Sequence, residues 1–289
     1  MKTQRKIAKL ISPTPVSDGA GVKLNRLIAT PTLDYLDPFL LLDHFGSENK
    51  DDYIAGFPEH PHRGIETVTY MLKGKVTHRD TMGNEGTISA GDIQWMTAGG
   101  GLMHEEMPVA EEEGLSGFQL WVNLPKELKM SKPRYQEVKA DKIPVYEKDG
   151  AKVKVIAGEV GDTKGAVSEI YAEPNYLDVK LAANAEFIHP IAAGHNAFAY
   201  IFDGSADFDE SGNLVENPKL VILTDGDFVK IKAGENGARF LLVSGKPLNE
   251  PVARYGPFVM NTRAELYEAI EDLQNGTFVW TEEKEVVTI

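Results

Sequence analysis

The 289-residue sequence contains no cysteine. A chain without thiols can form no disulfide and can offer no thiolate to a metal, so any metal ion must bind through nitrogen and oxygen donors. The sequence also lacks the run of about eighteen apolar residues that a membrane-spanning helix needs. No apolar stretch follows the basic residues between Met1 and Leu10, as a secretory signal would require. We therefore expect a cytoplasmic protein with no membrane partner.

Positive charge is also scarce. The chain has 30 Lys and Arg residues against 44 Asp and Glu residues, which gives a formal net charge of −14. A nucleic-acid backbone binds to cationic surfaces, so this balance argues against nucleic acid as a direct partner. The length is sufficient for one large or two medium globular domains.

Helical periodicity is rare in the chain, whereas turn signals are frequent. Residues 67–72 form a β-branched and aromatic run that ends at Lys73-Gly74, a pattern typical of a strand followed by a turn. Short apolar runs also follow Gly86 and Asp92. Residues 37–42 are expected to form a buried strand. Short strands at this density predict an all-β sandwich or barrel.

One helix is predicted near the end of the chain. Thr262 and Glu265 have the spacing of a capping box, in which each side chain satisfies a free backbone N–H of the other residue. Residues 266, 270 and 273 are apolar and share one face of the predicted helix, and Gly276 provides a C-terminal stop. We expect this helix to pack on the outside of a β-domain.

The second half of the chain repeats the layout of the first. The segments 60–64 and 70–74 have counterparts 130 residues later, at 190–194 and 200–204, and each pair ends in a glycine. Matching turn glycines indicate that the same backbone turns recur, so we infer a duplicated β-domain. The predicted boundaries are 1–135 for the first domain and 136–289 for the second.

Four potential metal donors occur as two pairs in the first domain. His60 and His62 form one pair, and His104 and Glu106 form the other. Residues two apart in a strand project from the same face, so each pair can direct two donors to one point. Three imidazoles and a carboxylate suit a borderline divalent cation. Glu105 should point to the opposite side of the strand.

The repeat provides an internal comparison for this site. The same offsets, with five extra loop residues, place Pro190, Ala192, Arg239 and Leu241 at the four equivalent positions. None of these residues can complete a metal site. We therefore predict a metal only in the first domain, and we interpret His189 and His195 as incidental.

These residues match two motifs of a known superfamily. The first motif is a glycine, His-x-His, a glutamate and a glycine, and it is matched by Gly56, His60, His62, Glu66 and Gly74. The second is matched by Gly91, Gly99 and His104, with Thr97 or Ala98 in place of a proline. The chain thus resembles the cupin superfamily. Within it, residues 57–64, 94–108 and 255–262 closely resemble segments of the pirin family, and the resemblance extends from about Gly19 to Gly276.

The resemblance to pirins implies a fold and a metal site. The expected fold is a bicupin, with two antiparallel, jelly-roll-like β-barrels and the C-terminal helix. The implied ligands are His60, His62, His104 and Glu106, with Glu66 as a neighbour or an alternative ligand. The expected ion is one Fe(II), with Ni, Cu, Mn, Co and Zn as alternatives. Arg63, which lies between His62 and Glu66 of the first motif, is interpreted as a solvated loop residue.

The resemblance also implies an activity. Some pirins are similar to quercetin 2,3-dioxygenases, which implies a small aromatic flavonol and O2 as substrates, release of carbon monoxide, and Glu106 as general base. Other pirins imply an iron-binding, redox-sensing regulatory protein. A third hypothesis is a metal-dependent enzyme acting on another small molecule. The sequence leaves these alternatives open.

Overall fold

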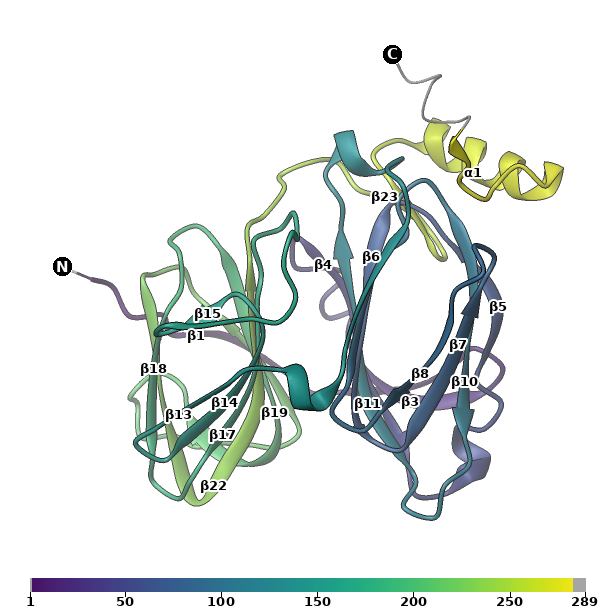
Figure 1. Ribbon diagram of the computed structural model, residues 1–289. Helices are drawn as coiled ribbons and strands as arrows, with labels where there is room; N and C mark the ends of the chain where they lie inside the picture. Colours follow the sequence, from purple (N-terminus) through teal and green to yellow (C-terminus); the bar gives the residue numbers. More distant parts are fainter. Residues whose placement is uncertain (1, 283–289) are drawn as a thin grey trace. The chain divides into compact units, whose positions relative to one another are not determined.

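The computed structural model describes residues 2–282, most of which lie in or between antiparallel strands (Figure 1). The chain divides into two compact units, each assembled from separate segments. The N-terminal unit comprises Pro15–Thr30, Phe39–Ala140 and the residues from Leu248 onward. The C-terminal unit comprises the residues up to Thr14, Pro31–Pro38 and Asp141–Pro247. No helix among residues 2–282 is long and apolar enough to cross a membrane.

Two sheets face each other in the N-terminal unit (Figure 1). The larger sheet has seven strands in the order β12 (Arg134–Val138), β9 (Ile93–Thr97), β6 (Ile65–Lys73), β11 (Leu115–Asn123), β4 (Phe39–Ser47), β3 (Val22–Ile28) and β2 (Thr14–Asp18). The smaller sheet has four, in the order β5 (Phe57–His62), β10 (Leu102–Val109), β7 (Lys75–Asp80) and β8 (Glu85–Ser89). The expected barrel is therefore a pair of facing sheets rather than one closed sheet.

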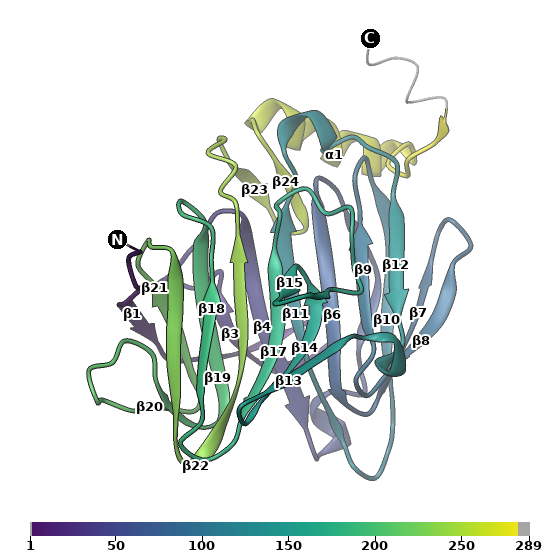
Figure 2. The same ribbon diagram turned by 60° about the vertical axis from the view of Figure 1, so that its left-hand side comes forward.

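The C-terminal unit repeats this order in a single nine-stranded sheet (Figure 2). Its main path is β1 (Ile7–Ile11), β21 (Lys219–Leu223), β19 (Asn196–Asp207), β22 (Phe228–Gly245), β17 (Asn175–Leu181), β14 (Ala151–Ala157) and β13 (Val145–Lys148). Two further strands lie off this path, β18 (Glu186–Pro190) on β22 and β20 (Val215–Glu216) on β19. The two seven-strand orders correspond position by position, which supports the duplication inferred from the turn glycines.

The units differ from a division into 1–135 and 136–289 at both ends of the chain. Strand β1 pairs with β21 of the C-terminal unit, with Ile11 opposite Leu220. At the other end, β23 (Ala253–Tyr255), β24 (Phe258–Met260) and α1 (Arg263–Asn275) belong to the N-terminal unit. A repeat in the sequence shows where strands recur, but it does not show on which copy a terminal segment docks.

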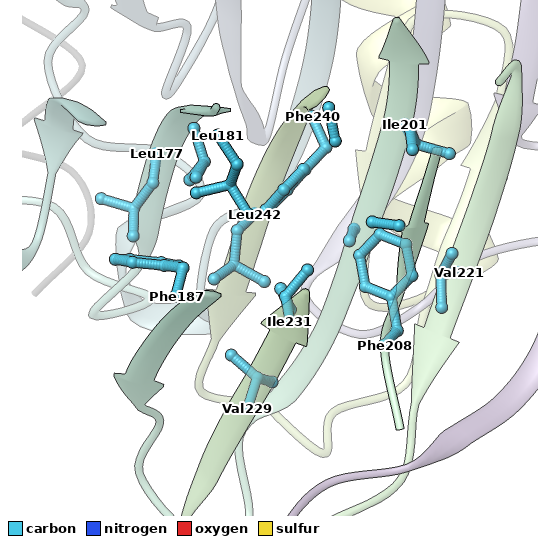
Figure 3. Packing of buried hydrophobic residues seen from close by; sticks show 14 of the residues in the cluster. Leu177, Leu181, Phe187, Ile201, Phe208, Val221, Val229, Ile231, Phe240 and Leu242 are labelled. Atoms are coloured by element: carbon cyan, nitrogen blue, oxygen red, sulfur yellow. The ribbon is translucent and has the colours of Figure 1, made fainter. Parts of the chain in front are cut away.

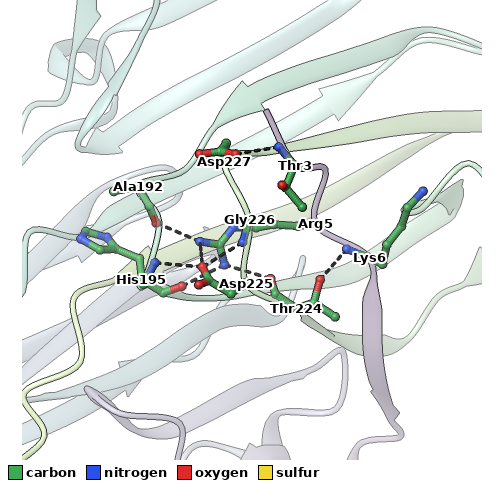
Figure 4. Close-up of polar contacts among 10 residues, drawn as sticks. Thr3, Arg5, Lys6, Ala192, His195, Thr224, Asp225, Gly226 and Asp227 are labelled. Carbon is green, nitrogen blue, oxygen red and sulfur yellow. Dashed lines mark hydrogen bonds and ion pairs between the residues drawn. The ribbon is translucent and has the colours of Figure 1, made fainter. Parts of the chain in front are cut away.

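The N-terminal segment is held by a buried arginine (Figure 4). Arg5 Nη1 donates to the carbonyl oxygens of His195 (2.8 Å) and Thr224 (3.0 Å), and Nη2 donates to that of Ala192 (2.9 Å). Burial lowers the pKa of Arg5, although neighbouring Asp225 acts in the opposite direction. The guanidinium thus connects the N-terminal segment to carbonyl groups of the loops before β19 and after β21.

The C-terminal segment is held by a second buried arginine, and here one sequence interpretation is wrong. Arg63 is only 1% exposed, not solvated. Its Nη1 pairs with Asp272 of α1 at 2.8 Å, and its Nη2 donates to the carbonyl oxygen of Phe278 at 2.9 Å. The predicted helix begins with the expected capping box at Thr262 and Glu265 and packs on the β23–β24 hairpin. Arg63 therefore ties the helix to the segment that carries His62.

Apolar side chains fill the interior of the C-terminal unit (Figure 3). Phe187, Phe208, Phe240 and Leu242 are buried together with branched residues from β22 and β19. His189 on β18 is also buried, stacked on Phe187 with ring centroids 5.8 Å apart. Burial lowers the pKa of this imidazole to about 4. In the N-terminal unit, burial lowers the pKa of His44 to the same value.

These two histidines predict acid sensitivity. Both pKa values lie below the value of about 6.5 expected in the unfolded chain, so the unfolded state binds more protons between pH 6.5 and 4. The free energy of unfolding should therefore fall as the pH drops below 6.5, by about 1.4 kcal/mol per pH unit for each histidine. Urea unfolding of the metal-free protein at several pH values measures this slope. In His189→Leu the slope should decrease by the contribution of one histidine, and identical slopes in the two proteins would contradict the assignment.

Candidate metal centre

Pairing between β5 and β10 brings three of the predicted donors together. His104 lies directly opposite His60, and Leu102 lies opposite His62. Because residues two apart share a face of a strand, all three imidazoles project to the same side of this sheet. Their candidate ligand atoms lie within 4.8 Å of one another. Nε2 of His60 is 3.1 Å from Nε2 of His62. The shared strand face predicted from the i, i+2 spacing is thus observed for the three histidines.

The imidazoles are suited to bind a cation. His62 and His104 are buried, and this burial, followed by the nearby imidazoles, holds the pKa of each well below its ordinary value. Both rings are therefore neutral near pH 7 and carry a free lone pair, the form that ligates metals. Both ring nitrogens of His104 are buried without a hydrogen-bond partner in the described part of the chain. Buried polar atoms rarely remain unpaired, and a divalent ion between the three rings would satisfy one nitrogen of each ring.

Glu106 lies beside the histidines but is held from the opposite sheet. The burial of β10 alternates, so Glu106 faces inward with His104 while Glu105 lies on the other face. Glu106 Oε1 accepts a hydrogen bond of 2.9 Å from Thr69 Oγ1 on β6. The carboxylate is not part of the three-histidine group. The role of Glu106 as fourth ligand therefore stays a prediction, whereas its place next to the group is observed.

Glu66 lies on the wrong face to act as an alternative ligand. It pairs with Thr97 and Val122, whereas the next residue, Thr67, pairs with Trp121, which lines the cavity beside the histidines. Successive residues of a strand point to opposite faces, so Glu66 points away from that cavity. Its Oε1 accepts a hydrogen bond from Thr97 Oγ1 at 2.8 Å, and burial raises its pKa. Sequence spacing alone had not distinguished the two faces of β6.

A row of polar side chains, which no motif in the sequence indicates, crosses the inner face of the seven-stranded sheet. Its members are direct neighbours on successive strands: Arg26, Asp43, Gln119, Thr69, Gln94 and Glu137. Thr69 Oγ1 lies 2.7 Å from Gln119 Oε1 as well as 2.9 Å from Glu106. This row is visible only once the pairing of the strands is known, because its members are far apart in the sequence.

His60, His62 and Glu106 line a cavity between the two sheets. Its volume is about 70 Å³, and its wall is mainly apolar, formed by Val22, Leu24, Leu41, Phe45, Val76, Leu115 and Trp121. A larger pocket of about 580 Å³ shares seven lining residues with it, including His60, His62 and Trp121. The Trp121 ring contacts His62 edge-on, with centroids 5.1 Å apart. The centre therefore lies where a small enclosed cavity meets a larger pocket.

In the C-terminal unit, the residues that occupy the positions of the four donors are not the ones predicted from the sequence. β18 pairs with the first part of β22 as β5 pairs with β10, and His189 lies opposite Val229 as His60 lies opposite His104. Pro190 is exposed, and Arg239 and Leu241 lie in the later part of β22, which pairs with β17. The counterparts of the four donors are His189, Ile191, Val229 and Ile231. The predicted alignment was one residue out at β18, which exchanges the two faces of a strand.

His189 is therefore in register with His60, at the position that was first assigned to Pro190. The counterparts of the other three donors, Ile191, Val229 and Ile231, are apolar and belong to the packed interior of the C-terminal unit. Across residues 2–282, His60, His62 and His104 form the one group of three or more potential donors. The conclusion that the second copy lacks a metal-binding set is thus supported, although the residues first assigned to it were wrong.

Comparisons with known proteins agree with this fold and site. The pirin family model matches residues 21–122, and the model of the pirin C-terminal cupin domain matches residues 176–279. A pirin-like protein of Caulobacter vibrioides is 46% identical over 95% of this chain and 99% of its own length. Pirin of Homo sapiens is 41% identical over 95% of this chain and 94% of its own length.

A solved structure is also similar over nearly its whole length. The crystal structure of a quercetin 2,3-dioxygenase from Acinetobacter baumannii superposes with a TM-score of 0.86 and 37% sequence identity, covering 96% of this chain and 99% of that one. The two β-units repeat one strand order, and the first carries the histidine motif on facing strands. On this agreement of motif, fold and relatives, the chain belongs to the pirin family and has its bicupin fold.

Proposed function

We propose that this chain is a metal-dependent dioxygenase that cleaves a flavonol such as quercetin with O2. The observation that carries the proposal is the three-histidine group, two members of which line a mainly apolar cavity, with the Glu106 carboxylate held beside it by Thr69. Few polar groups in an apolar pocket are typical of a site for a small organic ligand. The similarity to the Acinetobacter baumannii protein, whose structure bears the name of this activity, supports the same choice.

His60, His62 and His104 would hold the metal, with Glu106 as the predicted fourth ligand and Fe(II) as the expected ion. When bound, such an ion supplies a redox-active centre and lowers the pKa of a hydroxyl group that coordinates to it. The apolar wall and the Trp121 ring provide a surface for flat aromatic rings and exclude water from them. The protein's part in binding is therefore to orient the flavonol with its 3-hydroxyl toward the histidines.

Glu106 is positioned to remove the proton from that hydroxyl. Thr69 donates to Oε1 of the carboxylate, which leaves Oε2 free to accept a proton from a ligand in the cavity. In the overall reaction both atoms of O2 enter the products. Both ring bonds of carbon 3, C2–C3 and C3–C4, break; the two oxygen atoms become attached to carbons 2 and 4, and carbon 3 leaves with its own oxygen as carbon monoxide. No other oxidant or reductant is needed for this balance.

Metal analysis followed by oxygen uptake with quercetin tests the proposal. We expect bound transition metal, and O2 consumption matched by carbon monoxide release in a one-to-one ratio. Apoprotein prepared with a chelator serves as the control and should consume no oxygen. Tightly bound iron with neither flavonol binding nor turnover would overturn the proposal and favour the iron-binding, redox-sensing alternative.

Thr69→Val tests how Glu106 is held. Valine has nearly the shape of threonine but cannot donate to the carboxylate, so Glu106 should lose its fixed orientation. We expect kcat for quercetin to fall about tenfold while the metal content is unchanged. The loss of one hydrogen bond to a charged group typically costs about 1.5 kcal/mol, which corresponds to about a tenfold change in rate. Thr77→Val is a matched control, because Thr77 bonds to the carbonyl oxygen of Met107 and does not line the cavity. Equal kcat values in the two variants would show that Thr69 does not position the base.

A further inference from the structure

The guanidinium of Arg26 is rigidly held beside the cavity, and one end of it is unused. Its Nε and Nη2 donate to the two oxygens of Asp43 at 2.9 and 2.7 Å, and Nη2 also donates to Asp18 Oδ2 at 2.7 Å. Nη1 makes no hydrogen bond to any residue between 2 and 282, and the side chain is 18% exposed. Since a guanidinium is planar, the bonds to Asp43 also fix the direction of the two N–H groups on Nη1.

Asp18 provides an acceptor next to this donor. Its Oδ2 accepts from Arg26, its Oδ1 accepts from the backbone N–H of Gly19 at 2.8 Å, and the side chain is about half exposed. Each carboxylate oxygen can accept two hydrogen bonds, so both retain capacity for a ligand. A donor and an acceptor thus lie side by side, and both can be reached from the solvent side.

The Asp18–Arg26 pair lies on the path from the opening to the histidines. Both residues line the inner cavity and also the larger outer pocket, together with Phe57, His60 and Trp121. A ligand that extends from the metal centre into the outer pocket must therefore pass this pair. The two aromatic side chains on the same walls favour a flat ring there.

The charges around the pair restrict the kind of group that fits. The carboxylates that line the two cavities, Asp18, Asp43, Glu59 and Glu106, outnumber the guanidinium groups of Arg26 and Arg254, so an anionic group such as a carboxylate is disfavoured. A cationic amine would meet the unused N–H groups of Arg26. A neutral group that donates one hydrogen bond and accepts another satisfies both residues. Two hydroxyls on neighbouring carbons of an aromatic ring have this arrangement.

We propose that Asp18 and Arg26 form a recognition subsite for a catechol group of the ligand. One catechol hydroxyl donates to Asp18, and the neighbouring oxygen accepts from Nη1 of Arg26. The subsite makes these two residues determinants of specificity, not catalytic residues. Its assignment to a flavonol rests on the function proposed above.

Direct titration of the metal-loaded protein with two flavonols tests the subsite. Quercetin carries a catechol ring, whereas galangin has the same flavonol core without those two hydroxyls. We expect the wild-type protein to bind quercetin more tightly, and Asp18→Ala to reduce the ratio of the two affinities about tenfold. Asp18→Ala leaves the buried Arg26–Asp43 pair in place. Asp51→Ala, an exposed carboxylate that lines neither cavity, is the matched control.

Arg26→Lys is a second variant that keeps a positive charge next to Asp43 but removes the Nη1 donor. Arg26→Lys should also reduce the ratio of the affinities for quercetin and galangin. A cooperative melting transition of this variant confirms that it is folded. An unchanged ratio in both variants, with flavonols still bound, overturns the subsite and leaves the proposed function intact. Failure of the wild-type protein to bind either flavonol overturns both.

Discussion

Glu106→Gln is expected to lower kcat for quercetin by about two to four orders of magnitude while the metal stays bound. The amide has the size of the carboxylate and can still accept the hydrogen bond from Thr69, so the geometry around Oε1 should persist. It also retains an oxygen that can face the metal. It cannot accept a proton near neutral pH, so only the step that removes the hydroxyl proton should fail. Steady-state oxygen uptake, with metal content measured on the same samples, separates the two effects.

Glu105→Gln is the matched control for this variant. Glu105 is the next residue of the same strand, and the alternating burial of β10 places its side chain on the face away from the cavity. Its turnover should remain close to that of the wild-type protein. If both variants lose turnover equally, charge in this region matters but Glu106 is not the base. Full turnover in Glu106→Gln with metal bound would exclude the base role outright.

The sequence predicted the part of the site that depends on local geometry. His60 and His62 project to one side because residues two apart share a strand face, and the His-x-His spacing already contains that information. The pairing of β5 with β10, which places His104 opposite His60, is not contained in any local spacing. The interaction of Glu106 with Thr69 was not predictable in this way. It joins β10 to a strand of the other sheet, and no local spacing shows which residues of two facing sheets meet.

The two halves of the chain share their turn glycines but not the exact length of each turn. Turn glycines recur at a fixed offset, and they correctly predicted a duplicated β-fold. The turn before Gly64 and the one before Gly194 differ by one residue, however, and a shift of one residue exchanges the faces of a strand. The alignment therefore selected exposed Pro190 in place of buried His189. Fold signals tolerate such a shift, whereas the assignment of individual site residues does not.

Two buried cationic side chains, Lys129 and Arg63, were also not predicted from the sequence. Lys129 is 1% exposed, and its Nζ donates to the carbonyl oxygens of Gly64 and Val259 and to Asn123 Oδ1, at 2.7–3.0 Å. Together with Arg63, it connects the residues next to His62 to the C-terminal segment. Lysine and arginine are usually exposed, so a sequence gives no reason to place either in a core. Their partners are mainly backbone carbonyls, which leave no pattern in the sequence.

Removal of a histidine ligand should abolish metal binding without unfolding the protein. We expect the wild-type protein to bind one transition metal per chain, and His104→Ala to retain less than about a tenth of an equivalent after dialysis. His104 has no hydrogen-bond partner to lose in the described part of the chain, so its truncation removes a desolvated polar group at the cost of a small cavity. The melting temperature of the metal-free variant should stay within about 5 °C of the metal-free parent.

The C-terminal unit supplies both the reason for that expectation and its control. Val229 occupies the position equivalent to His104 and packs in an apolar interior, so this fold does not need a histidine or a metal there. His189→Ala removes a similarly buried and unpartnered imidazole, and it should leave the metal content at one per chain. If His104→Ala abolishes cooperative unfolding while His189→Ala does not, metal binding and folding are coupled in the N-terminal unit. If both variants lose metal, the ion depends on the integrity of the whole chain and not on the three histidines alone.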